Sequence, residues 1–366
     1  MRVGVLGAGQ LGQMLALAGR SLGVDFRFLA PDAGSPASNL AEQVVADYEN
    51  TAALEHFAEG LDVVTYEFES VPVSSVEFLA ERIPVYPPPR ALETAQDRLY
   101  EKQFFRKLGI PTPDFAAVGF ITELRDVLTR IGAPAVLKTR RLGYDGKGQY
   151  VLRNASEIEK AWVHVGGVPL ILEKFVDFSR ELSIIAVRSI EGDFRFYPLV
   201  ENHHSEGILR LSVAPAPSVS EALQSRAEDY ARRIMNELDY VGVLAVELFQ
   251  RGDELLANEM APRVHNSGHW TIEGASTSQF ENHLRAITGM PLGNTDPTGA
   301  AGMLNVIGTI PDLARIQHHP DAYVHMYGKQ PAPRRKLGHV TVLAADMQGV
   351  RNSVADLGRL LSKSSR

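Results

Sequence analysis

The chain of 366 residues contains no cysteine. Disulfide bonds, cysteine-ligated zinc, iron–sulfur clusters and a cysteine nucleophile are therefore excluded. The sequence also has no apolar run near the roughly 18–20 residues that span a bilayer. Residues 1–7 pass from a short apolar stretch into glycine, without the apolar core and small-residue cleavage site of a secretory signal. These absences predict a cytoplasmic protein.

An excess of positive charge is also lacking. The chain carries 37 Lys and Arg residues against 44 Asp and Glu residues, which gives a net charge of −7 at pH 7. This balance argues against charge-driven binding to nucleic acid or to an anionic membrane, although it is compatible with a local basic pocket for a small anion. Hydrophobic residues make up 45% of the chain, so we expect a folded globular protein, with roughly two to three domains for this length.

Strands alternate with helical stretches at the start of the chain. We predict strands at residues 2–6, 25–30 and 62–66, with a helix that follows the glycine-rich turn at residues 7–12. Strands separated by helices form parallel βαβ units, which predicts a doubly wound first domain. The four prolines within residues 84–89 cannot continue a helix or a central strand, so they mark a domain boundary.

The later part of the chain mixes strands with longer helices. A single amphipathic helix is expected at residues 91–108. The other predicted elements are a helix at 221–237 and strands at 135–139, 150–153, 170–175, 181–188, 241–249 and 255–260. From about residue 302 the chain combines short strands with proline-rich turns and the basic cluster Arg334-Arg335-Lys336.

The turn Gly7-x-Gly9-x-x-Gly12 has the spacing of a dinucleotide-binding fingerprint, and Asp32 stands where a ribose-binding acid belongs. Taken alone, this pattern favours an NAD-dependent enzyme. Glycines at a strand–helix turn are needed for the turn and for close packing whatever the ligand. The more general inference is that backbone N–H groups at this helix N-terminus attract a phosphate or a carboxylate.

Lys138 lies in an apolar strand just before the glycine-rich loop at residues 143–148. A lysine among apolar residues is unfavourable unless an anion meets it, and glycines let a loop backbone lie close to phosphates. We therefore predict a phosphate-binding hairpin, with an ordinary hairpin and a solvated basic tip as the alternative. The order of residues is not that of a Walker loop.

Glu247 and Glu259 each lie in an apolar strand, where an unpaired carboxylate is unfavourable. If residues 250–254 form a five-residue connection, Glu259 lies two residues along from the partner of Glu247 and on the same face. Two carboxylates that close require a cation, and oxygen ligands suit Mg²⁺ or Mn²⁺, with Asn258 as a possible further ligand. A two-residue turn at residues 252–253 would instead place them on opposite faces. A structural salt bridge is the other alternative.

The segment after the second of these strands, residues 261–270, is crowded with polar side chains and predicts a substrate pocket. His265 and His269 have the spacing of a zinc pair on a helix. No glutamate stands between them and no soft ligand lies near, so zinc is the weaker hypothesis.

Taken in this order, these features resemble an ATP-grasp enzyme, and more closely the 5-(carboxyamino)imidazole ribonucleotide synthase family of purine biosynthesis. The motifs that carry the resemblance are Gly9-Gln10-Leu11-Gly12, residues 66–72 (YEFESVP), residues 143–149 (GYDGKGQ), residues 197–199 with 207–210, and residues 258–271 (NEMAPRVHNSGHWT). The resemblance implies a mixed α/β and α+β ATP-grasp fold. It implies a Rossmann-like domain at residues 1–89, an ATP-grasp domain at 90–300 with a lid at about 115–175, and a small C-terminal β-rich domain at 301–366.

The resemblance also implies an activity and its ligands. The expected reaction is carboxylation of 5-aminoimidazole ribonucleotide by bicarbonate, with ATP as co-substrate, Mg²⁺ or Mn²⁺ as cofactor and carboxyphosphate as intermediate. A homodimer is expected, with no nucleic acid and no membrane as partner.

Site residues are implied by carry-over onto matching positions. The nucleotide side comprises Arg98, Lys138, Gly143, Tyr144, Asp145, Gly146, Lys147, Gly148, Gln149, Glu173, Lys174, Phe175, Val176, Glu181, His204, Asn258 and Glu259. The metal ligands are Glu247 and Glu259. The ribonucleotide side comprises Gly9, Gln10, Glu67, Tyr144, Asp145, Lys147, Arg263, His265, Asn266, Lys329, Arg335 and Lys336. The residues expected at the reacting groups are Asp145, Lys147, Arg263 and His265, and the base that takes the amine proton is either Asp145 or His265.

Three alternatives remain at this point. The first is an NAD-dependent oxidoreductase, which leaves Glu247 and Glu259 unexplained. The second is a formate-dependent ribonucleotide transformylase with the same fold. The third is a non-catalytic subunit that binds MgATP without turnover.

Overall fold

The first domain is a parallel sheet with helices on both faces. The computed structural model describes residues 1–143 and 145–363, and Tyr144 lies outside them. The sheet has the order β3-β2-β1-β4, formed by β1 (Arg2–Leu6), β2 (Asp25–Ala30), β3 (Glu42–Val45) and β4 (Val63–Tyr66). Helix α1 (Gln10–Arg20) packs on one face, and α2 (Thr51–Ala58) and α3 (Val73–Ala80) pack on the other. The doubly wound prediction is confirmed. The short, half-exposed strand β3 was not predicted.

The predicted helix at residues 91–108 is wrong, because the chain forms two helices there. Helix α4 (Pro89–Gln96) ends at Asp97, whose backbone is extended, and α5 (Arg98–Lys107) begins directly after it. The Asp97 carboxylate accepts the N–H of Leu99 at 3.0 Å and is held by Arg140 at 2.7 Å. An aspartate at an N-cap satisfies an otherwise unpaired amide, so the break is stabilised locally.

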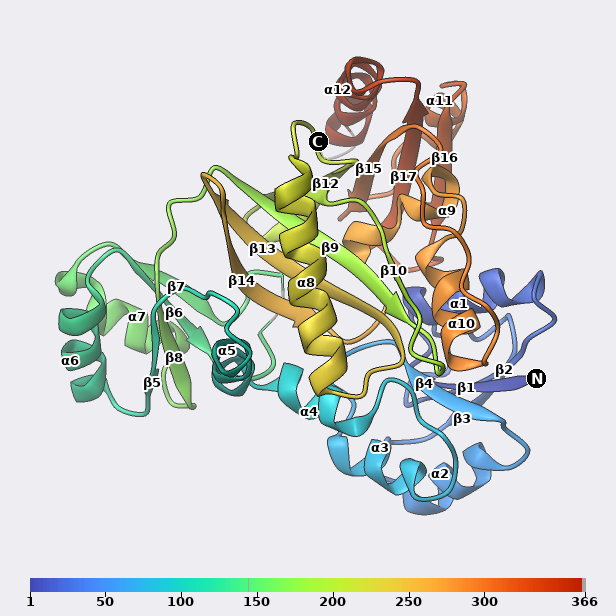
Figure 1. Ribbon diagram of the computed structural model, residues 1–366, viewed down its shortest axis with the longest axis horizontal. Helices are drawn as coiled ribbons and strands as arrows, with labels where there is room; N and C mark the ends of the chain where they lie inside the picture. The colour runs from blue at the N-terminus through green and yellow to red at the C-terminus, as the bar shows by residue number, and fades with distance from the viewer. Residues whose placement is uncertain (144, 364–366) are drawn as a thin grey trace.

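The lid is a separate four-stranded antiparallel sheet, drawn at the left of Figure 1. Its order is β5-β8-β6-β7, from β5 (Phe115–Val118), β6 (Ala135–Thr139), β7 (Gln149–Leu152) and β8 (Leu170–Lys174). Helices α6 (Ile121–Ile131) and α7 (Ile158–Val165), with the short η1 (Ala155–Glu157), cover it. Leu124, Leu137 and Leu172 lie in its own hydrophobic core. The lid therefore has a core independent of the main body.

A nine-stranded sheet forms the centre of the molecule. Its order is β14-β13-β9-β11-β12-β15-β17-β16, with β10 also paired to β9. The first members are β9 (Arg180–Arg188), β10 (Phe194–Phe196), β11 (Val200–Ser205), β12 (Ile208–Ala214), β13 (Gly242–Arg251) and β14 (Glu254–Ala261). Helix α8 (Glu221–Glu237) covers one face in Figure 1, and α10 (Gln279–Ile287) packs on the opposite face.

Alternation along β13 decides where Glu247 points. Val243 and Ala245 pack with the α10 side, whereas Leu244 and Val246 pack with the α8 side. Because successive side chains of a strand face opposite ways, Glu247 continues the face away from α8. That face is the one that lines the cavity described below.

The C-terminal strands extend the central sheet. They are β15 (Ala300–Ile307), β16 (Ala322–Met326) and β17 (Lys336–Ala344), and β15 pairs with β12. The short elements η2 (Asn266–Gly268), α9 (Thr271–Gly274) and α11 (Leu313–Gln317) lie in the connections, and the last helix is α12 (Met347–Lys363).

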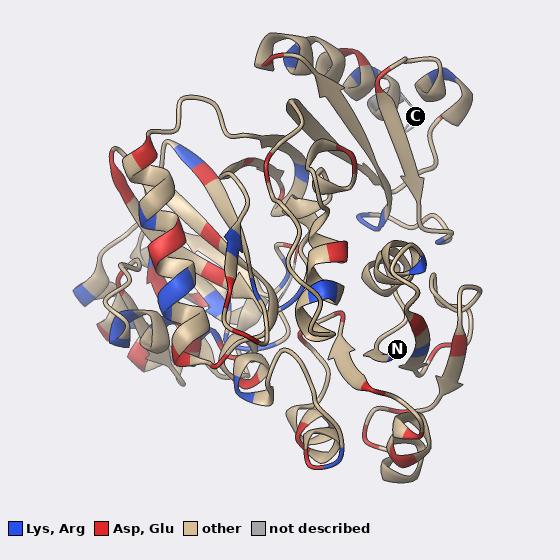
Figure 2. Ribbon diagram, turned by 45° about the vertical axis from the view of Figure 1, so that its right-hand side comes forward, with Lys and Arg blue, Asp and Glu red and all other residues tan. Residues whose placement is uncertain are grey.

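Charged side chains of both signs are interspersed along the chain (Figure 2). Among the described residues, no helix is both long enough and apolar enough to cross a membrane.

Candidate active site

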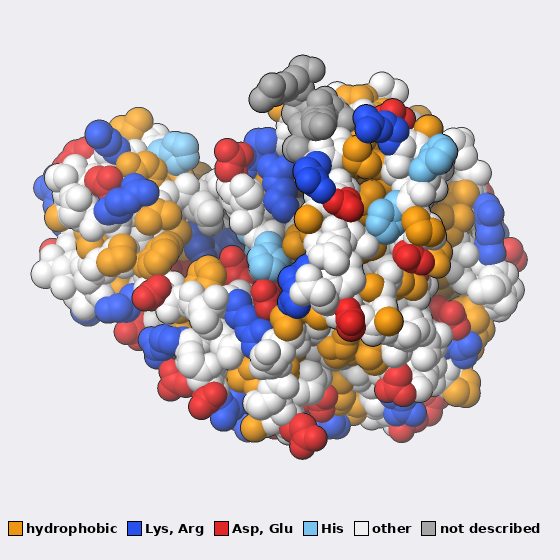
Figure 3. Space-filling model, turned by 90° about the horizontal axis from the view of Figure 1, so that it is seen from above, with side chains coloured by type: hydrophobic (Ala, Val, Ile, Leu, Met, Phe, Trp, Pro, Cys, Tyr) orange, Lys and Arg blue, Asp and Glu red, His pale blue; other side chains and the backbone are white. Residues whose placement is uncertain are grey.

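A cavity of about 1100 Å³ lies where the lid, the central sheet and the first domain meet. Figure 3 shows a hollow between the lid, at the left, and the main body, with charged and histidine side chains at its edge. The predicted site residues that line the cavity are Gln10, Glu67, Arg98, Lys138, Gly143, Asp145, Gly146, Lys147, Gln149, His204, Glu247, Asn258, Glu259, Arg263, His265, Asn266, Lys329, Arg335 and Lys336. Gln10 and Lys329, which are 319 positions apart in sequence, thus share one wall, where they also form a hydrogen bond.

Glu247 and Glu259 are direct partners in the β13–β14 ladder, but not for the predicted reason. The five-residue connection is wrong: Arg251 pairs with Glu254, so a two-residue turn joins the strands. Such a turn alone would separate the carboxylates. A β-bulge beside Glu247 restores the pairing, because Leu248 pairs with Ala257 whereas Glu247 pairs with Glu259. The extra residue is Asn258.

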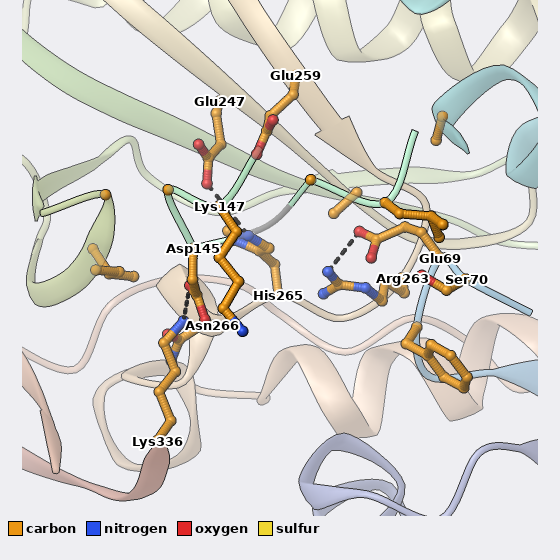
Figure 4. A pocket seen from close by; sticks show the side chains of 18 of the residues that line it. Glu69, Ser70, Asp145, Lys147, Glu247, Glu259, Arg263, His265, Asn266 and Lys336 are labelled. Carbon is orange, nitrogen blue, oxygen red and sulfur yellow. Dashed lines mark hydrogen bonds and ion pairs between the residues drawn. The ribbon is translucent and has the colours of Figure 1, made fainter. Parts of the chain in front are cut away.

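The two carboxylates point into the same cavity (Figure 4) and differ in charge environment. Burial and the negative charge of Glu259 raise the pKa of Glu247 to about 7. Burial also acts to raise the pKa of Glu259, but Arg98 and two lysines outweigh it and lower this pKa to about 2. Arg98 Nη1 lies 2.6 Å from Glu259 Oε2. Glu259 is therefore the ionised member of the pair below neutral pH, and a bound cation would favour the ionised form of both.

A buried chain of hydrogen bonds ends at His265, whose ring faces Glu247. Asn202 Nδ2 donates to Ser183 Oγ at 3.0 Å, and Ser183 Oγ donates to Ser267 Oγ at 2.8 Å. Ser267 Oγ lies 2.9 Å from His265 Nδ1, which also accepts the Ser267 N–H at 3.3 Å. Because Nδ1 is an acceptor, the ring proton is assigned to Nε2, which faces Glu247 Oε1 at 3.4 Å. Burial and nearby Arg263 hold the pKa of His265 well below its usual range, so the ring is neutral.

Lys138 has the anionic partner that its position in the strand requires. Its Nζ lies 3.0 Å from Glu173 Oε2, and the same oxygen lies 3.4 Å from Lys102 Nζ. Burial acts to raise the pKa of Glu173, but these lysines outweigh it and lower the pKa to about 2. Glu173 is only 2% exposed and does not line the cavity, so its carboxylate pairs with the two lysines behind the cavity wall.

The lid tip contacts the C-terminal region. Lys336 Nζ lies 3.0 Å from Asp145 Oδ1, an ion pair drawn in Figure 4, and Arg334 Nη2 donates to the Asp145 carbonyl at 2.7 Å. The backbone of Gly146 packs on Gly207, where an added Cβ would meet Gly146 Cα at 2.5 Å. Both glycines have positive φ, so a side chain at either position would be strained as well as crowded. The structure therefore holds the tip against the β11–β12 turn.

The helix N-terminus behind the glycine fingerprint is filled by a side chain of the protein itself. Glu67 Oε2 accepts the N–H of Gly12 at 2.6 Å, and Glu67 Oε1 accepts the N–H of Gly9. A Cβ on Gly7 or Gly9 would come within 2.7 Å of Glu67. The expected carboxylate at this helix is thus Glu67, and the glycine spacing serves this internal contact.

The wall beside the first domain carries positive charge. Arg263 Nη2 pairs with Glu69 Oε1 at 2.5 Å. Lys329 donates to the amide oxygen of Gln10 and Arg335 to the carbonyl of Gln330, and neither forms an ion pair within residues 1–143 and 145–363. Both groups line the cavity, so an anion in this part would meet two cations with neutral partners.

Comparison with known families assigns three parts of the chain. Residues 1–96 match the ribonucleotide synthetase preATP-grasp domain, residues 103–280 the ATP-grasp domain, and residues 301–353 the phosphoribosylaminoimidazole carboxylase C-terminal domain. A relative from Pseudomonas aeruginosa, named N5-carboxyaminoimidazole ribonucleotide synthase, is 52% identical over 361 residues, which is 99% of each chain. The chain belongs to the N5-carboxyaminoimidazole ribonucleotide synthase family.

Solved structures of this synthase family superpose on nearly the whole chain. The protein from Thermus thermophilus has a TM-score of 0.95 and 55% identity, with 98% of both chains covered. The protein from Aspergillus clavatus, described as a complex with ADP and 5-aminoimidazole ribonucleotide, has a TM-score of 0.93 and 33% identity, with 99% of this chain and 98% of that chain covered. The resemblance inferred from the sequence motifs and the ATP-grasp fold are therefore confirmed, and the protein is an ATP-grasp ligase.

Some residues predicted for this synthase lie outside the described cavity wall. They are Gly9, Gly148, Glu173, Lys174, Phe175, Val176 and Glu181. Glu181 Oε2 lies 2.9 Å from His204 Nδ1, so it borders the cavity through that histidine. Phe175 is 41% exposed and Lys174 donates to the Ile131 carbonyl, so a nucleotide-binding role for residues 173–176 stays a prediction.

The sequence interpretation missed several residues of the cavity and its support. They are Glu69, Asp97, Glu101, Lys102, Arg140 and Arg334. Glu101 and Lys102 are each 1% exposed although charged. Their adjacency to Arg98 on an amphipathic stretch was the available signal, because charged residues on the apolar face of a helix require partners.

Proposed function

We propose that this chain carboxylates the exocyclic amine of 5-aminoimidazole ribonucleotide with bicarbonate and ATP, giving 5-(carboxyamino)imidazole ribonucleotide, ADP and phosphate. The observation that carries the proposal is the single cavity in which a carboxylate pair, a glycine-rich lid and two cations with neutral partners come together, in a member of this synthase family. The description of the Aspergillus clavatus complex, with ADP and the same ribonucleotide, supports this pair of ligands.

The residues present fit a divalent cation. Glu247 and Glu259 offer carboxylate oxygens side by side, and Asn258 Oδ1 is buried with no hydrogen-bond partner among the described residues. Such an all-oxygen donor set suits Mg²⁺ or Mn²⁺. The described residues contain no group of three or more His, Asp or Glu in metal-binding geometry, so the remaining ligands would come from phosphates or water. When bound, the ion would neutralise charge on the phosphate oxygens.

The ATP phosphates would lie between the carboxylate pair and the lid. Arg98, Lys138 and Lys147 line this part of the cavity and supply positive charge to the transferring phosphoryl group. The glycines of the loop allow the backbone to approach the phosphates closely. This arrangement supports phosphoryl transfer from ATP rather than hydride transfer.

Two chemical steps follow from this arrangement. An oxygen of bicarbonate attacks the γ-phosphorus, the bond to ADP breaks, and carboxyphosphate forms. The amine nitrogen then attacks the carboxyl carbon, or CO₂ released from it, and phosphate leaves. Carboxyphosphate hydrolyses readily in water, so the contacts of the lid tip with Lys336 and Arg334 would serve to exclude solvent.

Asp145 is the better candidate of the two for the base that takes the amine proton. His265 accepts the Ser267 N–H at Nδ1, and its Nε2 faces a carboxylate, so neither nitrogen is open to receive a proton. The Asp145 carboxylate lines the cavity and is oriented by Lys336. A carboxylate held this way can accept a proton in a closed site.

The ribonucleotide phosphate would bind at the cationic wall. Lys329 and Arg335 donate only to neutral oxygens among the described residues, and Lys336 lies beside them. A phosphate there would form charge-assisted hydrogen bonds that the protein itself does not supply. The homodimer, the three-domain boundaries and the cytoplasmic location stay predictions.

A phosphate-release assay tests the reaction class. We expect release that requires MgATP, bicarbonate and 5-aminoimidazole ribonucleotide together, with each omission reducing it strongly. Release that needs formate and ignores bicarbonate would contradict the proposal in favour of the transformylase. Thermal stabilisation by NADH and not by MgATP would favour an oxidoreductase, and binding of MgATP without turnover would favour a non-catalytic subunit.

A further inference from the structure

The extra residue in β14 decides whether the carboxylate pair exists. From Arg251–Glu254 to Leu248–Ala257 the two strands pair one residue against one. Continuing that register would set Glu247 against Asn258 and turn Glu259 to the opposite face, since side chains alternate along a strand. The bulge at Asn258 shifts the register by one residue and returns Glu259 to the cavity face. A bulge leaves backbone groups outside the ladder, and buried unpaired groups are unfavourable.

Helix α5 supplies partners for these backbone groups. Lys102 Nζ donates to the carbonyl of Asn258 at 2.5 Å and to the carbonyl of Ala257 at 3.3 Å. Its neighbour Glu101 accepts the N–H of Met260 through Oε1 at 2.7 Å. Two consecutive side chains thus hold the backbone on both sides of Glu259, and each residue is 1% exposed. We call Glu101 and Lys102, with these hydrogen bonds, the clamp.

The clamp is also tied to the lid. Lys102 Nζ lies 3.4 Å from Glu173 Oε2, the oxygen that holds Lys138. Lys102 is therefore enclosed by acceptors from β14 and β8, and it does not line the cavity. A lysine that does not line the cavity but donates to the carbonyl of the bulge residue acts through the backbone.

We propose that Glu101 and Lys102 are positioning residues, which hold the bulge at Asn258 and thereby set Glu259 beside Glu247 to bind a divalent cation. The inference rests on the metal site of the proposed function. For a substitution that removes the charge of Lys102, a purely electrostatic effect and loss of the clamp predict opposite changes in cation affinity. Removing the positive charge of Lys102 would tighten cation binding if that charge acted only by repulsion, whereas losing the clamp would weaken it.

Three variants test the clamp, with Mn²⁺ titrated by electron paramagnetic resonance in the presence of saturating ADP. Lys102→Met keeps the length of the side chain and removes the donor. Glu101→Gln and Glu101→Leu both replace the carboxyl group with an uncharged side chain, but only Gln keeps an oxygen that can accept the Met260 N–H. The difference between these two variants therefore isolates the hydrogen bond, and it remains measurable if Lys102→Met fails to fold.

We expect Lys102→Met and Glu101→Leu to weaken Mn²⁺ binding by about 10- to 100-fold, with Glu101→Gln close to wild type. ADP affinity without metal should change little in all three. Unchanged or tighter Mn²⁺ binding by a folded Lys102→Met, or equal binding by Glu101→Gln and Glu101→Leu, would overturn the inference. Wild-type protein that binds no Mn²⁺ would overturn it together with the metal site. Tight Mn²⁺ binding without bicarbonate-dependent turnover would count against the proposed reaction alone.

Discussion

The two ends of the cavity differ in how their positively charged side chains are paired. At the β13–β14 end, cations of the protein are matched by its own carboxylates: Arg98 pairs with Glu259, and Lys138 with Glu173. At the end beside the first domain, Lys329 and Arg335 donate their side-chain hydrogen bonds to neutral oxygens and form no ion pair among the described residues. The first end has carboxylates to spare and suits a metal–phosphate complex. The second end has cations to spare and suits a lone phosphate group.

This difference shows that a count of charges does not identify a binding site. Both ends are rich in Lys and Arg, but only the partners of these side chains reveal the sign of the ligand each end can accept. The same holds for the helix N-terminus of α1, which would bind an anion if Glu67 did not already occupy it.

The largest effect is expected at the carboxylate end. Glu259→Gln keeps the size of the side chain but removes the charge opposite Glu247 and leaves Arg98 without its partner. Mg²⁺-dependent turnover should fall by about 100-fold or more, because charge stabilisation of the transferring phosphoryl group is lost. Steady-state phosphate release checks this. Glu254→Gln, on the same strand but exposed and paired with Arg251, is the matched control and should retain wild-type rates.

The second prediction concerns the cationic end. Lys329→Met should raise the KM for the ribonucleotide by about 10- to 100-fold, since one charge-assisted hydrogen bond to its phosphate is lost. The KM for ATP should stay within about 2-fold, because the two ends bind different ligands. Lys160→Met, on the exposed face of the lid, is the control. A rise confined to the KM for ATP would reverse the assignment of the two ends.

The third prediction uses the pKa of Glu247, which burial and Glu259 raise to about 7. Because its pKa is raised, Glu247 holds a proton in the metal-free protein at acidic pH. The protonated form favours the folded state relative to the unfolded state, and this contribution to folding stability is lost as pH rises through 7. The proton must leave before both carboxylates bind a cation. Mn²⁺ affinity should therefore fall about tenfold per pH unit below 7 and level off above it. Affinity that is flat between pH 6 and 8 would contradict the assignment.

The smallest effect is expected at the lid tip. Arg334 is partly exposed and donates to the carbonyls of Asp145 and Glu206 at 2.7 and 3.0 Å. Arg334→Ala should release the tip and cause a few-fold rise in ATP hydrolysis that is not coupled to the ribonucleotide. Comparing phosphate released with carboxylated product formed measures this. A coupling ratio equal to that of wild type would show that the tip needs no such contact.

The sequence predicted the fold where local patterns suffice. Strands β1 and β2, helix α8 and the lid strand β6 follow from hydrophobic periodicity, and they match the structure closely. It failed at Asp97, because the amphipathic pattern of residues 91–108 was given more weight than an aspartate that can cap a new helix. The pairing of Glu247 with Glu259 was predicted through the wrong connection, since a bulge is indistinguishable from a longer turn in a sequence.

The family resemblance of the motifs predicted more of the site residues than physical reasoning about individual residues did. Residue types such as Lys138 in an apolar strand pointed to an anion, and Glu173 supplies it within the protein. The roles of Glu101 and Lys102 could not be found this way, because their partners are backbone groups of β14 that only the folded register exposes.

The central claim is that ATP phosphorylates bicarbonate in this cavity. Bicarbonate labelled with ¹⁸O tests it directly, because an oxygen that attacks the γ-phosphorus stays on phosphorus after the carboxyl group has been transferred. We predict that phosphate formed with ribonucleotide, ATP and labelled bicarbonate carries one ¹⁸O atom. Phosphate without label, under conditions in which carboxylated product accumulates, would contradict the account.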